Sequence, residues 1–286
     1  MLQEYKFNPR ISRKNILKII ECIILIMLIL AFVFPFYWTI ITSVKTMFEA
    51  IETPPTLWPR EFVWSNYITV WNTKNFMKYG KNSLIMTLGA SAIQLVSSTM
   101  AAYAFARLQF KGKKALFFIS LADIMIPAQV IFLPIFIIYS RLGILNTYLS
   151  YFLIYIYSGS TIFFLRNAFM QVPEEMVEAA RLDGVGELSI VFKVMLPSVK
   201  SFMITQIMLI LISKWNGYFW IQVLTTNDNI RTLPLLLNSI LEVSEGMIVR
   251  WDLAMATNVM IMAPMLLLYI FCNRKMKVAF IGNGIK

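Results

Sequence analysis

Long apolar runs separated by short polar segments dominate this chain. A helix needs about 20 apolar residues to cross a bilayer, and five runs reach that length. A sixth run is shorter and contains Ser158, Gly159 and Ser160. The predicted spans are Ile16 to Val44, Ser83 to Ala106, Ala115 to Tyr139, Tyr148 to Leu165, Ser198 to Leu224 and Leu253 to Cys272. The pattern predicts an all-α, polytopic membrane protein with six transmembrane helices in a domain over 16–272.

The composition supports a membrane protein. Of 286 residues, 58% are hydrophobic and 14% are charged, and the mean hydropathy is +0.68. A soluble domain carries roughly 25% charged residues to keep its surface hydrated. The apolar surface of this chain therefore needs lipid as its solvent.

Basic residues are divided unevenly between the two sides that the spans define. With a cytoplasmic N-terminus, the inside segments carry 17 Lys and Arg and the outside segments carry 8. Because loop cations favour the cytoplasm, we expect cytoplasmic tails at 1–15 and 273–286, a short ordered external loop at 46–81 and a cytoplasmic loop at 167–197. This distribution explains the net charge of +11 without a nucleic-acid partner.

Residues that commonly carry catalysis are scarce. The chain contains no histidine, its two cysteines, Cys22 and Cys272, lie in apolar runs, and it has no G-x-x-x-x-G-K-[ST] phosphate-binding sequence. We therefore predict a chain that is not an enzyme, holds no metal or cofactor and does not hydrolyse ATP itself.

The cytoplasmic segment 167–197 carries the clearest local pattern. Pro173 suits a first helical position, acidic residues follow in the first turn, and Gly184 suits the left-handed end of a helix. A second short helix then places four apolar residues at helical spacing, namely Leu188, Val191, Phe192 and Met195. The segment is predicted to form two short helices joined by a glycine bend.

Two kinds of contact suit such an amphipathic segment. It can insert into a groove on a partner protein, or it can lie on the membrane surface. Five acidic residues disfavour an anionic lipid surface; they are Glu174, Glu175, Glu178, Asp183 and Glu187.

The spacing within this segment resembles a known family. It reads Glu178-Ala179-Ala180, then Gly184, then Val194, then Leu196-Pro197. This order is similar to the EAA loop of permeases in binding-protein-dependent ABC importers, with valine at Val194 in place of the more usual isoleucine.

Further matches resemble the sugar-importer branch, above all the smaller, six-span permease of maltose-type systems. They are Asn82-Ser83-Leu84, Ala101 to Arg107, Ile126-Pro127 with Gln129, Leu142-Gly143 through Asn146-Thr147, Phe164 to Arg166, Ala180 to Gly184, Trp215-Asn216 and Thr232 to Pro234. The resemblance covers about 82–272 and implies a type I ABC importer permease fold in a bacterial cell membrane.

The resemblance also implies partners. It implies a second, larger permease in a heterodimer, two ATP-binding subunits that hold ATP and Mg, and an extracytoplasmic sugar-binding protein. The residues it assigns to ATPase coupling are Glu178, Ala179, Ala180, Asp183, Gly184, Leu196 and Pro197. Among them, Glu178 is expected to contact the ATPase, Gly184 to form the bend, and Leu196-Pro197 to fix the loop to the fifth span.

Asp123 and Lys214 are ionisable residues inside predicted spans, where charged side chains face a cavity or a partner instead of lipid. One hypothesis is a structural pairing within the permease dimer. The other places Lys214 along the substrate pathway, where it attracts the carboxylate of an acidic sugar. Asn216 is a candidate for a sugar hydrogen bond. Trp215 is a candidate for an apolar sugar contact, with interfacial packing as the alternative.

Other classes of membrane protein remain as alternatives. A secondary transporter or channel is also hydrophobic and positive inside, although it more often shows inverted repeats and has no need of the EAA spacing. A membrane enzyme is disfavoured by the absence of histidine. A third alternative is an ABC importer permease for a solute other than a sugar.

Overall fold

The computed structural model describes residues 13–72, 76–242 and 249–282, and within these ranges it contains helices and no strand. The helices are α1 Arg13–Thr42, α2 Met47–Ala50, α3 Ser65–Asn72, α4 Phe76–Arg107, α5 Lys113–Ser120, α6 Ala122–Met125, α7 Ala128–Arg141, α8 Tyr148–Ile154, α9 Gly159–Met170, α10 Glu174–Leu182, α11 Glu187–Ile190, the π-helix Val191–Met195, α12 Leu196–Ser198, α13 Lys200–Trp215, α14 Phe219–Leu224, α15 Leu233–Glu242 and α16 Trp251–Gly282. The all-α prediction is confirmed for the described residues.

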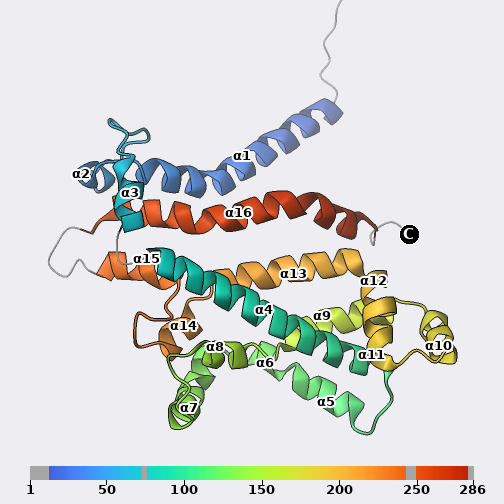
Figure 1. Ribbon diagram of the computed structural model, residues 1–286. Helices are drawn as coiled ribbons and strands as arrows, with labels where there is room; N and C mark the ends of the chain where they lie inside the picture. Colours follow the sequence, from blue (N-terminus) through green and yellow to red (C-terminus); the bar gives the residue numbers. More distant parts are fainter. Residues whose placement is uncertain (1–12, 73–75, 243–248, 283–286) are drawn as a thin grey trace, which may run out of the picture.

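The long helices lie roughly side by side (Figure 1). α4 packs against α9 and α13, α13 packs against α16, and α16 packs against α1. α10 and α11 lie at one end of this bundle, and α2, α3 and α15 lie at the other (Figure 1). We refer to these as the α10 end and the α15 end.

Three helices are long and apolar enough to cross a membrane. The segments are Leu17–Thr42, Phe76–Arg107 and Trp251–Cys272. Three further pairs of helices qualify when each pair is taken as one bent span, so the described residues contain between three and six candidate spans. The apolar window of the first span is not buried at all within the chain, so its surface is available to lipid or to another subunit.

The first bent pair contains two prolines of the predicted third span, Pro127 and Pro134. Lys113–Met125 and Ala128–Arg141 meet at 102°, with Ile126 extended and Pro127 preceding α7. A residue before proline avoids helical geometry and proline has no N–H to donate, so the chain breaks at Pro127. Pro134, by contrast, lies inside α7.

The second bent pair is α8 and α9, which meet at 51°. The Ser158 hydroxyl accepts a hydrogen bond from the Thr161 N–H at 3.4 Å, and the Asp123 carboxylate accepts one from the Gly159 N–H at 2.9 Å. Both acceptors satisfy N–H groups that a helix leaves unpaired at its start. Asp123 therefore has a structural partner within the chain, which is the first turn of α9.

Between α1 and α4 the described residues, 43–72, contain α2, α3 and a set of side-chain hydrogen bonds. The Glu49 carboxylate accepts hydrogen bonds from the Thr56 hydroxyl at 2.7 Å and from the Arg60 N–H at 3.0 Å. The buried Lys45 ammonium donates to the Thr56 carbonyl at 2.5 Å. Helix α4 begins at Phe76, so the last part of the predicted loop is helical.

Gly159 offers a test of the break between α8 and α9. A Cβ atom at Gly159 would lie 2.1 Å from the Ser120 carbonyl oxygen and 2.2 Å from Asp123 Oδ1. We expect Gly159→Ala to destabilise the protein by about 1–3 kcal/mol, because the backbone must shift to relieve this overlap. Thermal unfolding of the detergent-solubilised protein measures the effect. Gly80→Ala, where a Cβ meets nothing within 4 Å, is the matched control and should not lower the midpoint.

Candidate functional site

The 167–197 segment forms the α10 end of the molecule. Helix α10 follows Pro173, has Glu174 and Glu175 in its first turn and ends at Leu182. Gly184 has a φ of +75°, the Gly184 N–H donates to the Arg181 carbonyl, and the Val185 N–H donates to the Ala180 carbonyl. These two hydrogen bonds define a Schellman motif, so the predicted helix and its glycine bend are confirmed.

The helix after the bend differs from the predicted amphipathic helix. α11 runs into a π-helical turn at Val191–Met195 before α12 begins. A π-turn has i→i+5 hydrogen bonds and therefore changes which positions share a face; here Ile190, Val191 and Met195 are buried. The predicted face was wrong for Leu188 and Phe192, which are 67% and 53% exposed.

The exposed surface of this segment combines large apolar side chains with charged ones. Leu182 is 89% exposed, and Met176, Leu188 and Phe192 are also exposed. The predicted coupling residues Glu178, Ala179, Asp183 and Gly184 are exposed on the same segment. Exposed apolar side chains with polar neighbours mark surfaces that bind proteins or membranes.

This exposed segment stands on a packed base. Its buried side chains join those of α4 and α9 in one apolar cluster, formed by Ala102, Tyr103, Leu165, Phe169, Val172, Val177, Ile190, Val191 and Met195. Leu196 is partly buried against the same cluster, whereas Pro197 is exposed at the start of α12. The chain then turns by 93° into α13.

A carboxylate ties three helices together at this base. The Glu187 carboxylate of α11 accepts hydrogen bonds from Arg181 Nε of α10 at 2.8 Å and from the Tyr103 hydroxyl of α4. The hydrogen bond from the Arg181 guanidinium is the main reason why the pKa of the Glu187 carboxyl lies below its usual range, and the hydrogen bond from the Tyr103 hydroxyl is the second. Both bonds stabilise the charged form of the carboxyl. Glu187 thus stays ionised and bonded at neutral pH.

Two arginines strengthen the same junction. The Arg107 guanidinium at the end of α4 donates to the Phe169 carbonyl at 2.8 Å and to the Val172 carbonyl. Arg166 Nε of α9 donates to the Phe105 carbonyl at 3.2 Å. Phe169 lies in the last turn of α9 and Val172 lies just beyond it, so together the two arginines cross-link α4 with α9.

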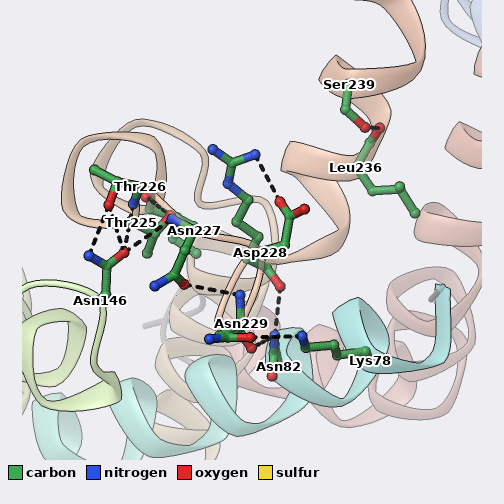
Figure 2. Close-up of polar contacts among 12 residues, drawn as sticks. Lys78, Asn82, Asn146, Thr225, Thr226, Asn227, Asp228, Asn229, Leu236 and Ser239 are labelled. Carbon is green, nitrogen blue, oxygen red and sulfur yellow. Dashed lines mark hydrogen bonds and ion pairs between the residues drawn. The ribbon is translucent and has the colours of Figure 1, made fainter. Parts of the chain in front are cut away.

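A polar cluster connects α4 to two loops at the α15 end (Figure 2). Asn82 Nδ2 donates to the Asn229 and Arg231 carbonyls at 3.0 and 2.9 Å, and the Tyr148 hydroxyl donates to Asn82 Oδ1 at 2.6 Å. Asn146, in the loop before α8, accepts hydrogen bonds from the Thr226 and Asn227 N–H groups. The 225–232 loop is therefore held against α4 and the start of α8.

The predicted substrate-pathway residues take three different positions near the end of α13. Lys214 is 7% exposed, and its Nζ lies 3.4 Å from the centre of the Tyr155 ring. None of the ion pairs found in the described residues includes Lys214.

Trp215 is buried, and its indole N–H donates to the Ile261 carbonyl at 3.0 Å. Trp215 therefore packs α13 against α16.

Asn216 lies in the break between α13 and α14 and is exposed. It lines a cleft of about 270 Å³ between this break, α15 and α16, and its polar neighbours there are Tyr218, Asn238 and Asn258. Amide and hydroxyl groups both donate and accept hydrogen bonds, so this cleft can bind hydroxyl groups. Lys214 does not line it.

Sequence reasoning missed the structural roles of Tyr103, Arg107 and Glu187. Tyr103 and Arg107 fall within a stretch that resembles the sugar-importer branch, and Glu187 entered only as one of five acidic residues. Their contacts join residues 62 to 84 positions apart. Local spacing carries no signal for a pairing over such distances.

These features define a polytopic membrane protein. Residues 94–276 match the family described as binding-protein-dependent transport system inner membrane component, and the chain belongs to this family. The resemblance to binding-protein-dependent permeases is thereby confirmed, and the protein is a membrane-embedded transport permease.

Several curated relatives match most of the chain. The inner membrane ABC transporter permease protein YcjP of Escherichia coli is 27% identical over 257 residues, which cover 88% of this chain and 91% of YcjP. The arabinooligosaccharides transport system permease protein AraQ of Bacillus subtilis is 26% identical over 98% of this chain and 99% of AraQ. The sn-glycerol-3-phosphate permease UgpE of Pectobacterium atrosepticum is 27% identical over 92% of this chain and 96% of UgpE.

Solved structures share the fold. A chain of a bacterial ABC transporter involved in the import of the acidic polysaccharide alginate superposes with a TM-score of 0.80 at 24% identity, over 93% of this chain and 99% of that chain. A chain of a bacterial alginate ABC transporter, in complex with a periplasmic protein bound to alginate pentasaccharide, gives 0.69 at 15% identity, over 92% of this chain and 94% of that chain. The fold is that of an ABC transporter permease.

Arg107 offers a test of the junction between α4 and α9. We expect Arg107→Ala to destabilise the protein by about 1–3 kcal/mol, because the Phe169 and Val172 carbonyls both lose a charged donor and the Phe169 carbonyl keeps only the Val172 N–H. Thermal unfolding in detergent measures this loss. Limited proteolysis should also cleave the 167–197 segment faster. Lys111→Ala, an exposed cation close in the chain to Arg107, should change neither measurement.

Proposed function

We propose that this chain is one permease subunit of an ATP-driven importer for sugars or oligosaccharides. The chain forms half of the translocation pathway, and a separate subunit hydrolyses ATP. Membership of the binding-protein-dependent family supports the importer. Relatives named for arabinooligosaccharide transport support a sugar substrate.

The proposed topology has six spans and places both termini in the cytoplasm. Each bent pair then counts as one crossing, and the excess of Lys and Arg falls on the cytoplasmic side. In this orientation the α10 end faces the cytoplasm, and the 46–81 segment and the 225–232 loop face outward. The tails at 1–15 and 273–286 are then cytoplasmic, although the described part of the second continues α16 as far as Gly282.

The observation that carries the coupling role is the exposed apolar surface of the 167–197 segment on a cross-linked base. Leu182, Leu188 and Phe192 are accessible to a partner, while Tyr103, Arg107 and Glu187 hold the segment in place. In the proposal this EAA loop inserts into a groove of an ATPase subunit. Glu178, Ala179, Ala180 and Asp183 contribute to that contact, Gly184 forms the bend, and Leu196-Pro197 connects the loop to α13.

The proposed complex contains four kinds of subunit. A larger second permease pairs with this chain, two ATP-binding subunits hold ATP and Mg, and an extracytoplasmic binding protein delivers the sugar. The exposed surface of α1 leaves room for the second permease. The complex of an alginate transporter with its periplasmic protein supports the presence of a binding protein.

Asn216 is the proposed contact of this chain with the sugar. Its cleft presents amide and hydroxyl groups beside apolar side chains, which suits the hydroxyl groups and the carbon faces of a sugar. Lys214 and Trp215 remain weaker candidates, because both side chains are buried within the chain. UgpE, which is named for sn-glycerol-3-phosphate, favours a non-sugar solute as the second candidate function.

Gly184→Trp tests the coupling role. Gly184 has a positive φ, and a Cβ there meets nothing within 4 Å, so the substitution strains the bend and places bulk on the docking surface. We expect at least a tenfold loss (about 1.4 kcal/mol) of transport and of binding-protein-stimulated ATP hydrolysis in proteoliposomes.

Gly112→Trp is the matched control. Gly112 also has a positive φ and open space around its Cβ, but it lies before α5, outside the 167–197 segment. It should leave stimulated hydrolysis near its original rate. Full transport and hydrolysis by an intact Gly184→Trp complex would show that the bend has no coupling role.

Lys214→Ala tests whether this lysine selects acidic sugars. The identified partner of its ammonium is a tyrosine ring and not a carboxylate. On this hypothesis, the carboxylate of a transported acidic sugar pairs with the ammonium. On this hypothesis the variant loses uptake of uronate oligosaccharides by about tenfold and retains uptake of neutral ones. Radiolabelled uptake of both substrates measures the ratio, and an equal loss of both, or of neither, removes the hypothesis.

A further inference from the structure

α4 makes side-chain hydrogen bonds to a separate part of the chain near each of its ends. At the α10 end, the buried Tyr103 hydroxyl donates to the Glu187 carboxylate, which also accepts from Arg181. One carboxylate thereby joins α4 to both helices of the EAA loop. A displacement of that loop must move α4 or break these bonds.

At the α15 end, α4 is bonded to the 225–232 loop (Figure 2) and to Leu233, the first residue of α15. Asn82 donates to two carbonyls of the loop. Lys78 Nζ donates to Asn229 Oδ1 at 3.1 Å, and the Ser83 hydroxyl accepts from the Leu233 N–H at 2.9 Å. Asn82 is buried. Its hydrogen bonds to the two loop carbonyls are therefore shielded from competing solvent.

The helix between these two ends is suited to transmit a displacement. Asn82 and Tyr103 are 21 residues apart, which is about 31 Å along a helix and matches a hydrocarbon core of about 30 Å. α4 runs unbroken from Phe76 to Arg107 and contains no proline. The other long helices, α1 and α16, contain Pro35 and Pro264. Proline removes a hydrogen bond inside a helix and permits bending.

We propose that α4 transmits displacement between the EAA loop and the 225–232 loop, with Tyr103 and Asn82 as the positioning residues at its two ends. This inference rests on the proposed function, because it assumes that an ATPase subunit binds the EAA loop and that the 225–232 loop faces the binding protein. The transmission is mechanical: two bonded ends move together because the helix between them is stiff.

A reporter in the external loop tests the proposal in the assembled transporter. Asn227→Cys is introduced after Cys22 and Cys272 are replaced by serine, and the complex is reconstituted in nanodiscs. The measured quantity is the change in the maleimide labelling rate at position 227 when a non-hydrolysable ATP analogue with Mg is added. We expect a nucleotide-dependent change in the otherwise unaltered complex.

Tyr103→Phe removes one hydroxyl from the cytoplasmic end of α4. It should reduce the nucleotide-dependent change by about fivefold or more, the lower range of measured couplings between distant sites. Asn82→Ala should have the same effect from the other end, and Tyr148→Phe, which removes one bond to Asn82, is the milder second variant.

Because coupling of binding equilibria is reciprocal, the same variants should affect nucleotide binding. In the unaltered complex the docked binding protein tightens nucleotide binding, and in these variants it should do so less.

Tyr37→Phe is the matched control. It also removes one hydroxyl hydrogen bond, from Tyr37 of α1 to the Leu57 carbonyl, and should leave the labelling change intact. The proposal is overturned if the labelling change is absent from the unaltered complex, if it persists at full size in assembled Tyr103→Phe and Asn82→Ala complexes, or if Tyr37→Phe reduces it equally. If the Asn82→Ala complex does not assemble, Tyr148→Phe is used instead to test the Asn82 end of α4.

Failure of this inference differs from failure of the proposed function. If Gly184→Trp retains stimulated hydrolysis, the EAA loop itself has no coupling role. If Gly184→Trp abolishes stimulation while Tyr103→Phe preserves both stimulation and the labelling change, coupling passes through the EAA loop but not through α4.

Discussion

The close packing of α4 against α9 and α13 is the contact on which the rest of the structure depends. The buried face of α4 is lined by small and polar side chains, including Ala90, Ser98 and Ala102, which are completely buried. Small residues let membrane helices approach closely, and hydrogen bonds such as that between Gln94 and Thr161, at 2.8 Å, add to the packing. Because α4 is held on both sides, the segments bonded to its two ends acquire fixed positions.

Breaks in the apolar helices impose a second constraint, because each break leaves backbone groups that lipid cannot satisfy. The chain meets this requirement with nearby side chains. Asp123 and Ser158 accept from the first turn of α9, and Arg107 donates to the Phe169 carbonyl in its last turn. Asp123 thus has a structural role at the start of α9. The identified contact of Lys214, by contrast, is an aromatic ring. Lys214 is therefore the residue on which the hypothesis of an acidic substrate rests.

The two ends of the bundle have different chemistry, and the difference fits the proposed division of labour. The α10 end exposes large apolar side chains over a base cross-linked by charged groups. The α15 end is rich in amides, with Asn82, Asn146 and Asn229 in one network and Asn216 in a cleft. An apolar docking surface suits a permanent protein partner, whereas amides suit hydroxyl-bearing solutes and reversible contacts.

Hydropathy, local backbone preference and a long spaced motif are enough to predict the all-α membrane class, the glycine bend at Gly184 and the family. They do not predict that Leu188 and Phe192 are exposed, since a π-turn interrupts the helical period on which the prediction rested. Three further features follow from tertiary packing: Trp215 packs inside the bundle, Asp123 caps α9, and Tyr103 and Glu187 meet although they are 84 positions apart. Contacts between distant residues depend on how whole helices pack, and no local pattern encodes them.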